Sequence, residues 1–474
     1  MILAHSVLIL GGRWEGDEWA NFGNYRHGGI GWLGYRMLTW SPRPASELAL
    51  YCYYLAISWV HAPLITPFLT ALWLLLIGCS LAAMRSADAV GGVQRFAVAL
   101  TVLAMCLLGH KVFELFYWPM AAAAYMPALA GMIVVTFRIL LGGPNLRRDR
   151  LVCCAALSLA AASAETGVFF VVGFTVVLLI LEAPGWLRGG SGGVASAAWY
   201  LVPLAICIAV LASAFRFRVG NATTGVGTTD IYFHHLWPSL LATLHDLPRR
   251  FVSIRGPASD LHLGPGLLMK ALLFAGFAAT CRSSLMVALP WRRVVALACG
   301  LLATVVLTSL AAYYQYSMAG SEHHDTFQQC AIVLLLLLLA RLVAPFWPGD
   351  ARAAGIIGPF CLIAAIVAGM APRLPGLLDD YALLPQIRAA RSQTWDSGMD
   401  PAVKSIQFVE APEGHVLRDI RWATGHFVLN PADKTANFWY VYGVLDFFGK
   451  QEIDFLPASD VTPAPATRAA GHGS

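Results

Sequence analysis

Long apolar runs alternate with short polar loops along most of the chain, and this pattern predicts a bundle of membrane-spanning helices. A helix needs about 20 apolar residues to cross the hydrocarbon core of a bilayer. It also satisfies its own backbone hydrogen bonds, as lipid requires. We therefore expect an all-α polytopic membrane protein with about eleven transmembrane helices in a transmembrane domain of residues 1–371. The expected spans are the short run 1–12, the runs 63–84, 96–109 and 120–141, two helices within 151–181, and the runs 194–214, 263–280, 294–314, 327–342 and 353–370.

Polar stretches define the remaining parts of the chain. Residues 12–47 form a polar and aromatic loop, and the aromatic run 48–60 predicts a helix at the membrane interface. A second long polar loop covers residues 216–262. Residues 372–460 are long and polar enough for a small domain, with strand-like or helical segments at 405–409, 415–420 and 438–448, and residues 461–474 have the composition of a disordered tail.

Arginine and lysine in the short loops indicate the orientation of the bundle. Alternate short loops carry arginine clusters, whereas the loops between them carry few basic residues. We expect the basic loops in the cytoplasm, together with the N-terminus. The loops 12–47 and 216–262 and the C-terminal domain are then extracytoplasmic. The arginines of the basic loops are Arg85, Arg95, Arg147, Arg148, Arg150, Arg188, Arg282, Arg292, Arg293, Arg341 and Arg352.

The composition agrees with a membrane protein and excludes an ordinary soluble domain. Hydrophobic residues make up 58% of the 474 residues and charged residues only 12%, whereas soluble proteins carry about 25% charged residues. The formal net charge of +5 comes from scattered basic residues and does not favour nucleic-acid binding. The ten cysteines show no metal-site spacing, and we interpret them as core or lipid-facing residues.

Asp17 and Glu18 follow the first apolar run directly. A carboxylate just outside the membrane can take a proton from an attacking hydroxyl group, so both are candidate catalytic residues or metal ligands. The alternative is that Asp17 caps a short helix that begins at Glu18. The two interpretations do not exclude each other.

Two further outside groups could bind substrate. Arg43 matches a phosphate, because a guanidinium fork fits phosphate oxygens; contact with lipid headgroups is the alternative. His110, Lys111 and Glu114, followed by Tyr117, form a second candidate substrate-binding cluster. The helical spacing also allows a local pair of Glu114 with Lys111 or His110.

Glu165 lies in a polar break, residues 163–167, where two helices are expected to meet. Carboxylates at membrane depth usually face a cavity or a partner, so Glu165 is a third catalytic candidate. His323, His324 and Asp325 lie on the last short outside loop. Consecutive residues of a helix cannot all point one way, so we expect surface or phosphate contacts for His323 and His324 rather than a metal site.

The layout resembles the GT-C superfamily, the integral membrane glycosyltransferases that use polyprenyl-phosphate sugars. The likeness lies in an acidic motif on the first outside loop, many spans, an interfacial helix and an outside C-terminal domain. Better-known members carry Asp-Asp or Asp-Glu in the acidic motif, and here it is Asp17-Glu18. The stretches that carry the likeness are 16–19, 40–43, 117–119 with Tyr125, 163–167 and 437–443.

The resemblance implies a single displacement on the extracytoplasmic face of a bacterial inner (plasma) membrane. Asp17 would be the base on the acceptor hydroxyl, and the lipid-linked phosphate would leave. Arg43, Lys111 and His324 would stabilise the charge that develops on the leaving group. The implied partners are a polyprenyl-phosphate-linked sugar, membrane lipids, and a glycan, lipid or protein acceptor. The resemblance fixes no cofactor, and a divalent metal stays open because some members need one.

Other functions compete with glycosyl transfer. A transporter or flippase for lipid-linked sugars predicts ionisable residues deep in several spans, yet residues 63–84, 96–108 and 332–340 hold none. A non-catalytic envelope assembly protein predicts that Asp17→Asn is harmless. An O-antigen-ligase-like enzyme or an acyltransferase is a closer rival.

Overall fold

Apolar helices make up most of the fold, as the alternation of apolar runs and polar loops predicts. In the described part of the computed structural model, seven helical stretches are long and apolar enough to cross a membrane. The expected class, a helical polytopic membrane protein, is thereby confirmed, whereas the count of eleven spans stays a prediction. The seven stretches contain α4 (Ile65–Ala83), α7 (Pro119–Leu140), α9 (Glu165–Leu187), α12 (Leu263–Ser284), α13 (Trp291–Tyr316), α14 (Glu322–Val343) and α15 (Ala351–Met370).

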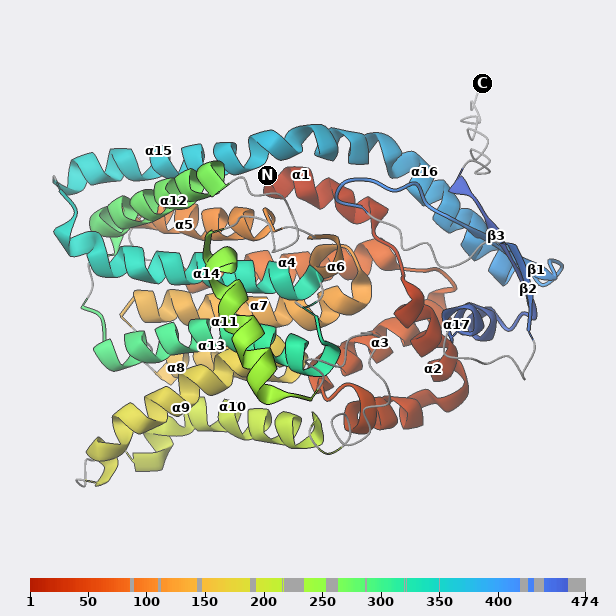
Figure 1. The fold of residues 1–474 in the computed structure, drawn as a ribbon, viewed down its shortest axis with the longest axis horizontal. Coiled ribbons are helices and arrows are strands. Elements are labelled where there is room, and N and C mark those ends of the chain that lie inside the picture. The colour runs from red at the N-terminus through yellow and green to blue at the C-terminus, as the bar shows by residue number, and fades with distance from the viewer. Residues whose placement is uncertain are drawn as a thin grey trace, which may run out of the picture.

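Shorter helices complete the bundle (Figure 1). They are α1 (Ile2–Val7) with η1 (Leu8–Gly11), α5 (Ala89–Cys106), α6 (Val112–Phe116), α8 (Arg147–Ser163), α10 (Gly193–Ser213) and α11 (Leu236–Val252). The structure describes residues 1–85, 89–109, 112–142, 147–187, 193–214, 216, 234–252, 263–285, 288–318, 320, 322–348, 350–417, 425–429 and 439–458.

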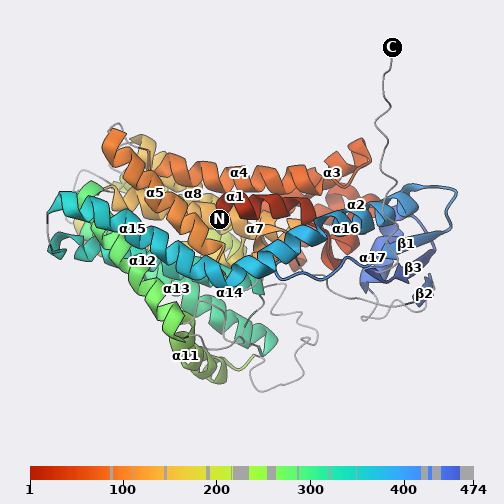
Figure 2. The same cartoon turned by 90° about the horizontal axis from the view of Figure 1, so that it is seen from above.

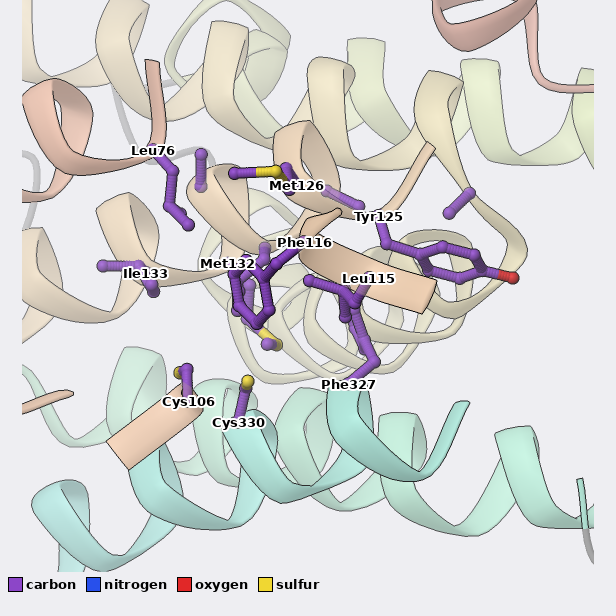
Figure 3. Close-up of a cluster of buried hydrophobic side chains, with 14 of the residues drawn as sticks. Leu76, Cys106, Leu115, Phe116, Tyr125, Met126, Met132, Ile133, Phe327 and Cys330 are labelled. Carbon is purple, nitrogen blue, oxygen red and sulfur yellow. The ribbon is translucent and has the colours of Figure 1, made fainter. Parts of the chain in front are cut away.

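Helix α7 runs through the middle of the bundle, and nearly all of its residues are buried. Small residues let its neighbours approach closely: a Cβ atom on Gly131 would lie 2.3 Å from the Ala156 carbonyl oxygen of α8. Figure 3 shows its apolar side chains beside Phe116 of α6 and Phe327 of α14. Tyr125 borders this apolar core, and its hydroxyl group points away from it. The apolar core therefore packs against the Tyr125 ring, and the Tyr125 hydroxyl group can make polar contacts outside the core.

Helices α8 and α9 meet at Ala164, where the sequence predicts a break. A Cβ atom on Gly167 would lie 2.1 Å from the Ala160 carbonyl oxygen, so the tight junction requires glycine there. Two helices do meet at this break, as predicted, but α9 continues beyond the expected limit of residue 181 and is not a short helix, since it is long enough to span a membrane. Glu165 is the first residue of α9 and therefore lies at the end of a span rather than within it.

The polar stretch 12–47 is mostly helical, which corrects the prediction of a loop. It contains α2 (Gly16–Tyr35), which is kinked at Gly29 with φ +51°, and a π-helical turn, η2 (Arg36–Trp40). The predicted interfacial helix follows as α3 (Pro44–Val60), with proline in its first turn. Helices α2 and α3 contact each other. They form a helical hairpin, and most of the polar residues of this stretch lie on its two helices and on the turn η2.

The C-terminal part begins as a direct continuation of the bundle. Helix α15 passes through η5 (Ala371–Arg373) into α16 (Leu374–Met399). This continuous stretch of 49 residues is about 70 Å long, more than twice the hydrocarbon thickness of a bilayer. Most of α16 must therefore lie outside the membrane.

A small α/β unit follows α16. Strand β3 (Glu452–Leu456) lies between β1 (Ser405–Val409), to which it is parallel, and β2 (Gly425–Val428), to which it is antiparallel. β1 matches the predicted segment 405–409, whereas the segment 438–448 forms α17 (Trp439–Phe448). The segment expected at 415–420 lies partly outside the described residues.

Helix α17 packs against α2, so the C-terminal α/β unit contacts the N-terminal part of the chain (Figure 2). The contact depends on Gly443, where a Cβ atom would lie 2.5 Å from the backbone nitrogen of Ala20. Five aromatic rings surround Trp14 at this junction, namely Trp19, Phe22, Tyr53, Trp395 and Phe447. The α/β unit therefore fixes the position of the helix that carries Asp17.

Gly443→Ala is expected to lower the free energy of unfolding by about 1–3 kcal/mol, because a methyl group there overlaps the α2 backbone. The measurement is thermal denaturation of the purified protein in detergent. Gly34→Ala, also on α2, is the control: a Cβ atom on Gly34 meets nothing within 4 Å, so alanine should be neutral or mildly stabilising. Equal melting temperatures for the two variants would contradict the packing of α17 on α2.

Candidate functional site

The acidic motif begins helix α2. Glu15 is the N-cap residue, and its side chain accepts a hydrogen bond from the backbone of Glu18, while the Glu18 carboxylate accepts one from the Glu15 backbone nitrogen at 3.1 Å. This reciprocal pair is a capping box. Asp17 is therefore in the first turn of the helix and is not its cap. A carboxylate there is stabilised by the positive end of the helix dipole.

Glu18 is fully buried and is held by three donors. Besides the Glu15 nitrogen, its carboxylate accepts hydrogen bonds from Trp118 Nε1 at 2.5 Å and from the Met120 backbone nitrogen at 2.8 Å. Burial raises the pKa of Glu18, and the three donors only partly offset this. Its contacts join α2 to the start of α7, so we interpret Glu18 as a structural residue.

Glu18→Ala should destabilise the protein, because it leaves buried donors of Trp118 and Met120 without their acceptor. Each stranded group costs about 1–3 kcal/mol. Thermal unfolding in detergent measures the loss, with Asp17→Ala as the matched control one residue away on the exposed side. The structural interpretation would be wrong if Glu18→Ala kept the wild-type melting temperature.

Asp17 differs from its neighbour because its side chain is exposed. Among the described residues, none forms a hydrogen bond or ion pair with its carboxylate. Burial by the surrounding protein nevertheless raises the pKa of Asp17 above its ordinary value of 3.8, while the charges of Arg36, Arg43 and His323 lower it and that of Glu47 raises it. The carboxylate is thus reachable from outside and lies within the field of three basic side chains.

Arg36 and Glu47 form a buried bidentate ion pair beside Asp17. Arg36 Nε lies 2.7 Å from Glu47 Oε2, and Arg36 Nη2 lies 2.8 Å from Glu47 Oε1. The Tyr25 hydroxyl group donates to Glu47 Oε2 at 3.4 Å. Both charged side chains are almost completely buried, so the pair locks η2 to α3.

Arg43 precedes α3 and reaches across to Glu165 at the start of α9. Its Nε lies 2.5 Å from Glu165 Oε2, and its guanidinium carbon lies 5.8 Å from the centre of the Tyr125 ring. Burial alone would lower the pKa of Arg43, but Glu165 and Tyr125 more than offset it, so the pKa is raised and the side chain stays charged. About a fifth of each partner's side chain is exposed, at 22% and 20%, so the pair is open to a ligand.

His323 and His324 approach the same place from the start of α14. His323 Nδ1 lies 2.5 Å from Glu114 Oε2 of α6, which also accepts from the His323 backbone nitrogen at 3.0 Å. The ring centres of His323 and Tyr125 are 4.6 Å apart, and His324 Nε2 lies 3.3 Å from the Tyr125 hydroxyl. Tyr125 therefore links Arg43 on one side to the two histidines on the other.

These contacts bring residues from seven helical elements together at one end of the bundle, and we call the group the polar cluster. Its members are Asp17, Arg36, Arg43, Glu47, Glu114, Tyr125, Glu165, His323 and His324. Chemically it offers one exposed carboxylate, three basic groups near it, and carboxylates that hold those groups in place. Such an arrangement suits proton removal next to a bound anion.

Two other residues singled out from the sequence, Tyr117 and Asp325, make contacts outside the polar cluster. Tyr117 is fully buried, donates a hydrogen bond to the His5 carbonyl oxygen at 3.0 Å and lies 2.7 Å from His5 Nδ1. It therefore packs the core. Asp325 pairs with Arg250 at 2.5 Å rather than joining its two histidine neighbours. His110 and Lys111 lie outside the described residues.

Two observations bear on ligands. Within the described part of the chain, no group of three or more His, Cys, Asp or Glu side chains is arranged to hold a metal ion. A depression of about 520 Å³, open mouth included, is lined by Arg13, Trp14, Trp19 and Arg391 among others. It contains no side chain of the polar cluster. The polar cluster is therefore the candidate site, because the exposed carboxylate and the basic groups lie there.

Sequence reasoning missed Arg36 and Glu47. Both occur in a stretch interpreted as a loop, where an ion pair between them has no periodic signature. Their spacing of 11 residues becomes meaningful only once η2 and α3 are known to be helical. Two opposite charges that flank the Pro-containing turn 41–44 were the available signal.

The comparisons with known proteins identify no family. No protein-family model matches the chain, and no curated protein and no solved structure matches it significantly.

Proposed function

We propose that the protein is a membrane glycosyltransferase that moves a sugar from a polyprenyl-phosphate donor to an acceptor hydroxyl group. One observation carries the proposal: the exposed Asp17 carboxylate, which has no partner among the described residues, faces the charges of Arg36, Arg43 and His323. The setting, at the end of a helical membrane bundle, agrees with a substrate whose lipid stays in the bilayer.

The proposed step is a single displacement. The acceptor oxygen forms a bond to the anomeric carbon of the donor sugar, and Asp17 takes the proton of that hydroxyl group. The bond between the anomeric carbon and the phosphate oxygen breaks, and the polyprenyl phosphate leaves with the electron pair. Atoms and charge balance, because the proton gained by Asp17 offsets the negative charge gained by the phosphate.

Arg43 is the proposed phosphate-binding residue. Its guanidinium group is charged, partly exposed and fixed by Glu165, which meets the need for a donor that is positioned before charge develops. Glu165 then acts as a positioning residue for Arg43. His324 is the second candidate on the phosphate, since Tyr125 connects it to Arg43.

The proposal includes the orientation that the basic loops indicate. The polar cluster and the α/β unit would be extracytoplasmic and the N-terminus cytoplasmic, in a bacterial inner membrane. The α/β unit, which packs on α2, would then help to hold the acceptor near Asp17.

The pH dependence of turnover tests the role of Asp17. A protonated carboxylate cannot accept a proton, so kcat/KM should fall as the pH drops through the pKa of Asp17, and this limb should lie above 3.8, the ordinary value, because burial raises that pKa. The measurement is polyprenyl-phosphate release by purified protein in nanodiscs across the pH range. In Asp17→Asn the residual kcat/KM should no longer fall at low pH. If it falls as in the wild type, a group other than Asp17 is responsible for the pH dependence.

A further inference from the structure

Helix α11 has its polar and apolar faces arranged the opposite way from a helix on a soluble protein. Leu236, Trp237, Leu241 and Leu244 are exposed, and their accessible fractions are 63%, 66%, 49% and 50%. At about 100° per residue Trp237, Leu241 and Leu244 fall on one side of the helix, and Leu236 is its first residue. The sequence predicted a polar loop at 216–262, whereas α11 is a helix within this segment. A polar segment is not expected to expose an apolar helix face, so the surroundings of this face matter.

The opposite face of α11 is polar and buried. Ser239, Thr243, Asp246 and Arg250 recur at helical spacing and are all nearly inaccessible to solvent. Asp246 accepts a hydrogen bond from the Tyr313 hydroxyl group of α13. The polar face is therefore built to bind the neighbouring spans.

Arg250 makes two further contacts of this face. Its Nη1 lies 2.5 Å from Asp325 Oδ1 and also donates to the Gln328 side chain of α14. Asp325 follows His324 directly, so α11 is tied to the helix start that carries two members of the polar cluster. Figure 1 shows α11 crossing α13 and α14.

The surroundings of α11 favour lipid over water as the medium on its outer side. Leu267 and Leu268, at the start of the candidate span α12, are 50% and 58% exposed, and α12 contacts α11. Lys270 of α12 donates a hydrogen bond to the Phe251 carbonyl oxygen near the end of α11, so α11 lies beside a helix that is long and apolar enough to cross the membrane. Of the exposed polar residues, Arg249 lies in the last turn of α11, where a long basic side chain can reach lipid headgroups. His245 lies near the middle of the helix.

We propose that the outer face of α11 is a lipid-binding surface that rests in the acyl-chain region at the membrane boundary. A polar face turned inward and an apolar face turned outward suit an apolar solvent, in which buried charges are paired with the protein interior. Helix α11 then lies between the bilayer and the start of α14, which carries His323 and His324. The inference depends only on the burial pattern and does not rest on the proposed glycosyl transfer.

Photolabelling of the full-length wild-type protein in nanodiscs tests the inference. The probe is a phosphatidylcholine with a diazirine near the end of one acyl chain, and adducts are located by peptide mass spectrometry. We expect adducts at Leu236, Trp237, Leu241 and Leu244, with a yield within about threefold of that at Leu74, an exposed residue of the span α4. Ser239 and Thr243, on the buried face, should carry none.

Hydroxyl-radical footprinting of the same sample measures which side chains are exposed to water. Water-facing Val428 of β2, which is 58% exposed, should be oxidised strongly, and the outer face of α11 weakly. Strong oxidation of Leu241 and Leu244 without lipid adducts would overturn the inference in favour of a water-exposed helix. Absence of both labels would overturn it in favour of a protein partner that covers this face.

Discussion

Asp17→Asn is expected to lower kcat for sugar transfer by about 10²–10⁴-fold, the usual contribution of a positioned general base. Asparagine keeps the size and the exposed position of the side chain but cannot accept the proton. Exposed substitutions away from packing contacts change stability by about 0.5 kcal/mol or less, so the melting temperature should stay that of the wild type. The measurement is the initial rate of polyprenyl-phosphate release at saturating donor, with thermal unfolding alongside.

Asp396→Asn is the matched control for this substitution. Asp396 is also an exposed aspartate on a helix, in this case α16, and no contact joins it to the polar cluster among the described residues. Its replacement should leave kcat within about twofold of the wild-type value, as for any surface change without a role. Full activity of Asp17→Asn would remove Asp17 as the base and favour a non-catalytic role for the protein.

Glu47→Ala is expected to lower the free energy of unfolding by about 3–5 kcal/mol, the usual cost of leaving one member of a buried ion pair uncompensated. Arg36 would lose both of its bonds to the carboxylate, and the Tyr25 hydroxyl would lose its acceptor. Because this pair joins η2 to α3 beside Asp17, activity should fall together with stability. Thermal unfolding in detergent measures the effect.

Two variants isolate the buried charge as the cause. Asp379→Asn removes a partner of His415 from a pair whose side chains are both 66% exposed, and such pairs contribute about 0–1 kcal/mol. The double variant Arg36→Met/Glu47→Leu removes both charges and should recover most of the lost stability, as apolar replacements of buried pairs do. If the double variant were as unstable as Glu47→Ala, the cost would come from lost packing instead.

Seven of the expected spans correspond to helices that are long and apolar enough to cross a membrane in the described part of the chain, and they could be predicted because lipid leaves few alternatives to an apolar helix. The break at 163–167 was visible for the same reason, since polar residues cannot continue a lipid-facing segment. The helix in 12–47 was harder to see. Its N-cap is Glu15, whereas capping-box signals are usually read from Ser or Thr, and its glycines lower helix propensity.

The sequence indicated several residues of the polar cluster, but it did not indicate which of them contact each other. Arg43, Glu165 and His323 were chosen for their chemistry, and the structure places Arg43 against Glu165. Local spacing suggested His110 or Lys111 for Glu114, and both lie outside the described residues; a described partner of Glu114 is His323, 209 residues away. Such contacts depend on how helices pack, which short-range spacing does not encode. Glu18 and Tyr117 show the same limit, because burial gave both a structural contact that the sequence does not reveal.

We propose that the polar cluster catalyses the cleavage of a lipid-linked sugar phosphate. The most direct test is to incubate the purified protein in nanodiscs with a panel of polyprenyl-phosphate sugars and candidate acceptors, and to quantify both products by mass spectrometry. We expect at least one donor to yield polyprenyl phosphate and glycosylated acceptor in equal amounts, and we expect Asp17→Asn to lower this yield by about 10²–10⁴-fold. No lipid-phosphate release with any donor, or equal release by Asp17→Asn, would contradict it.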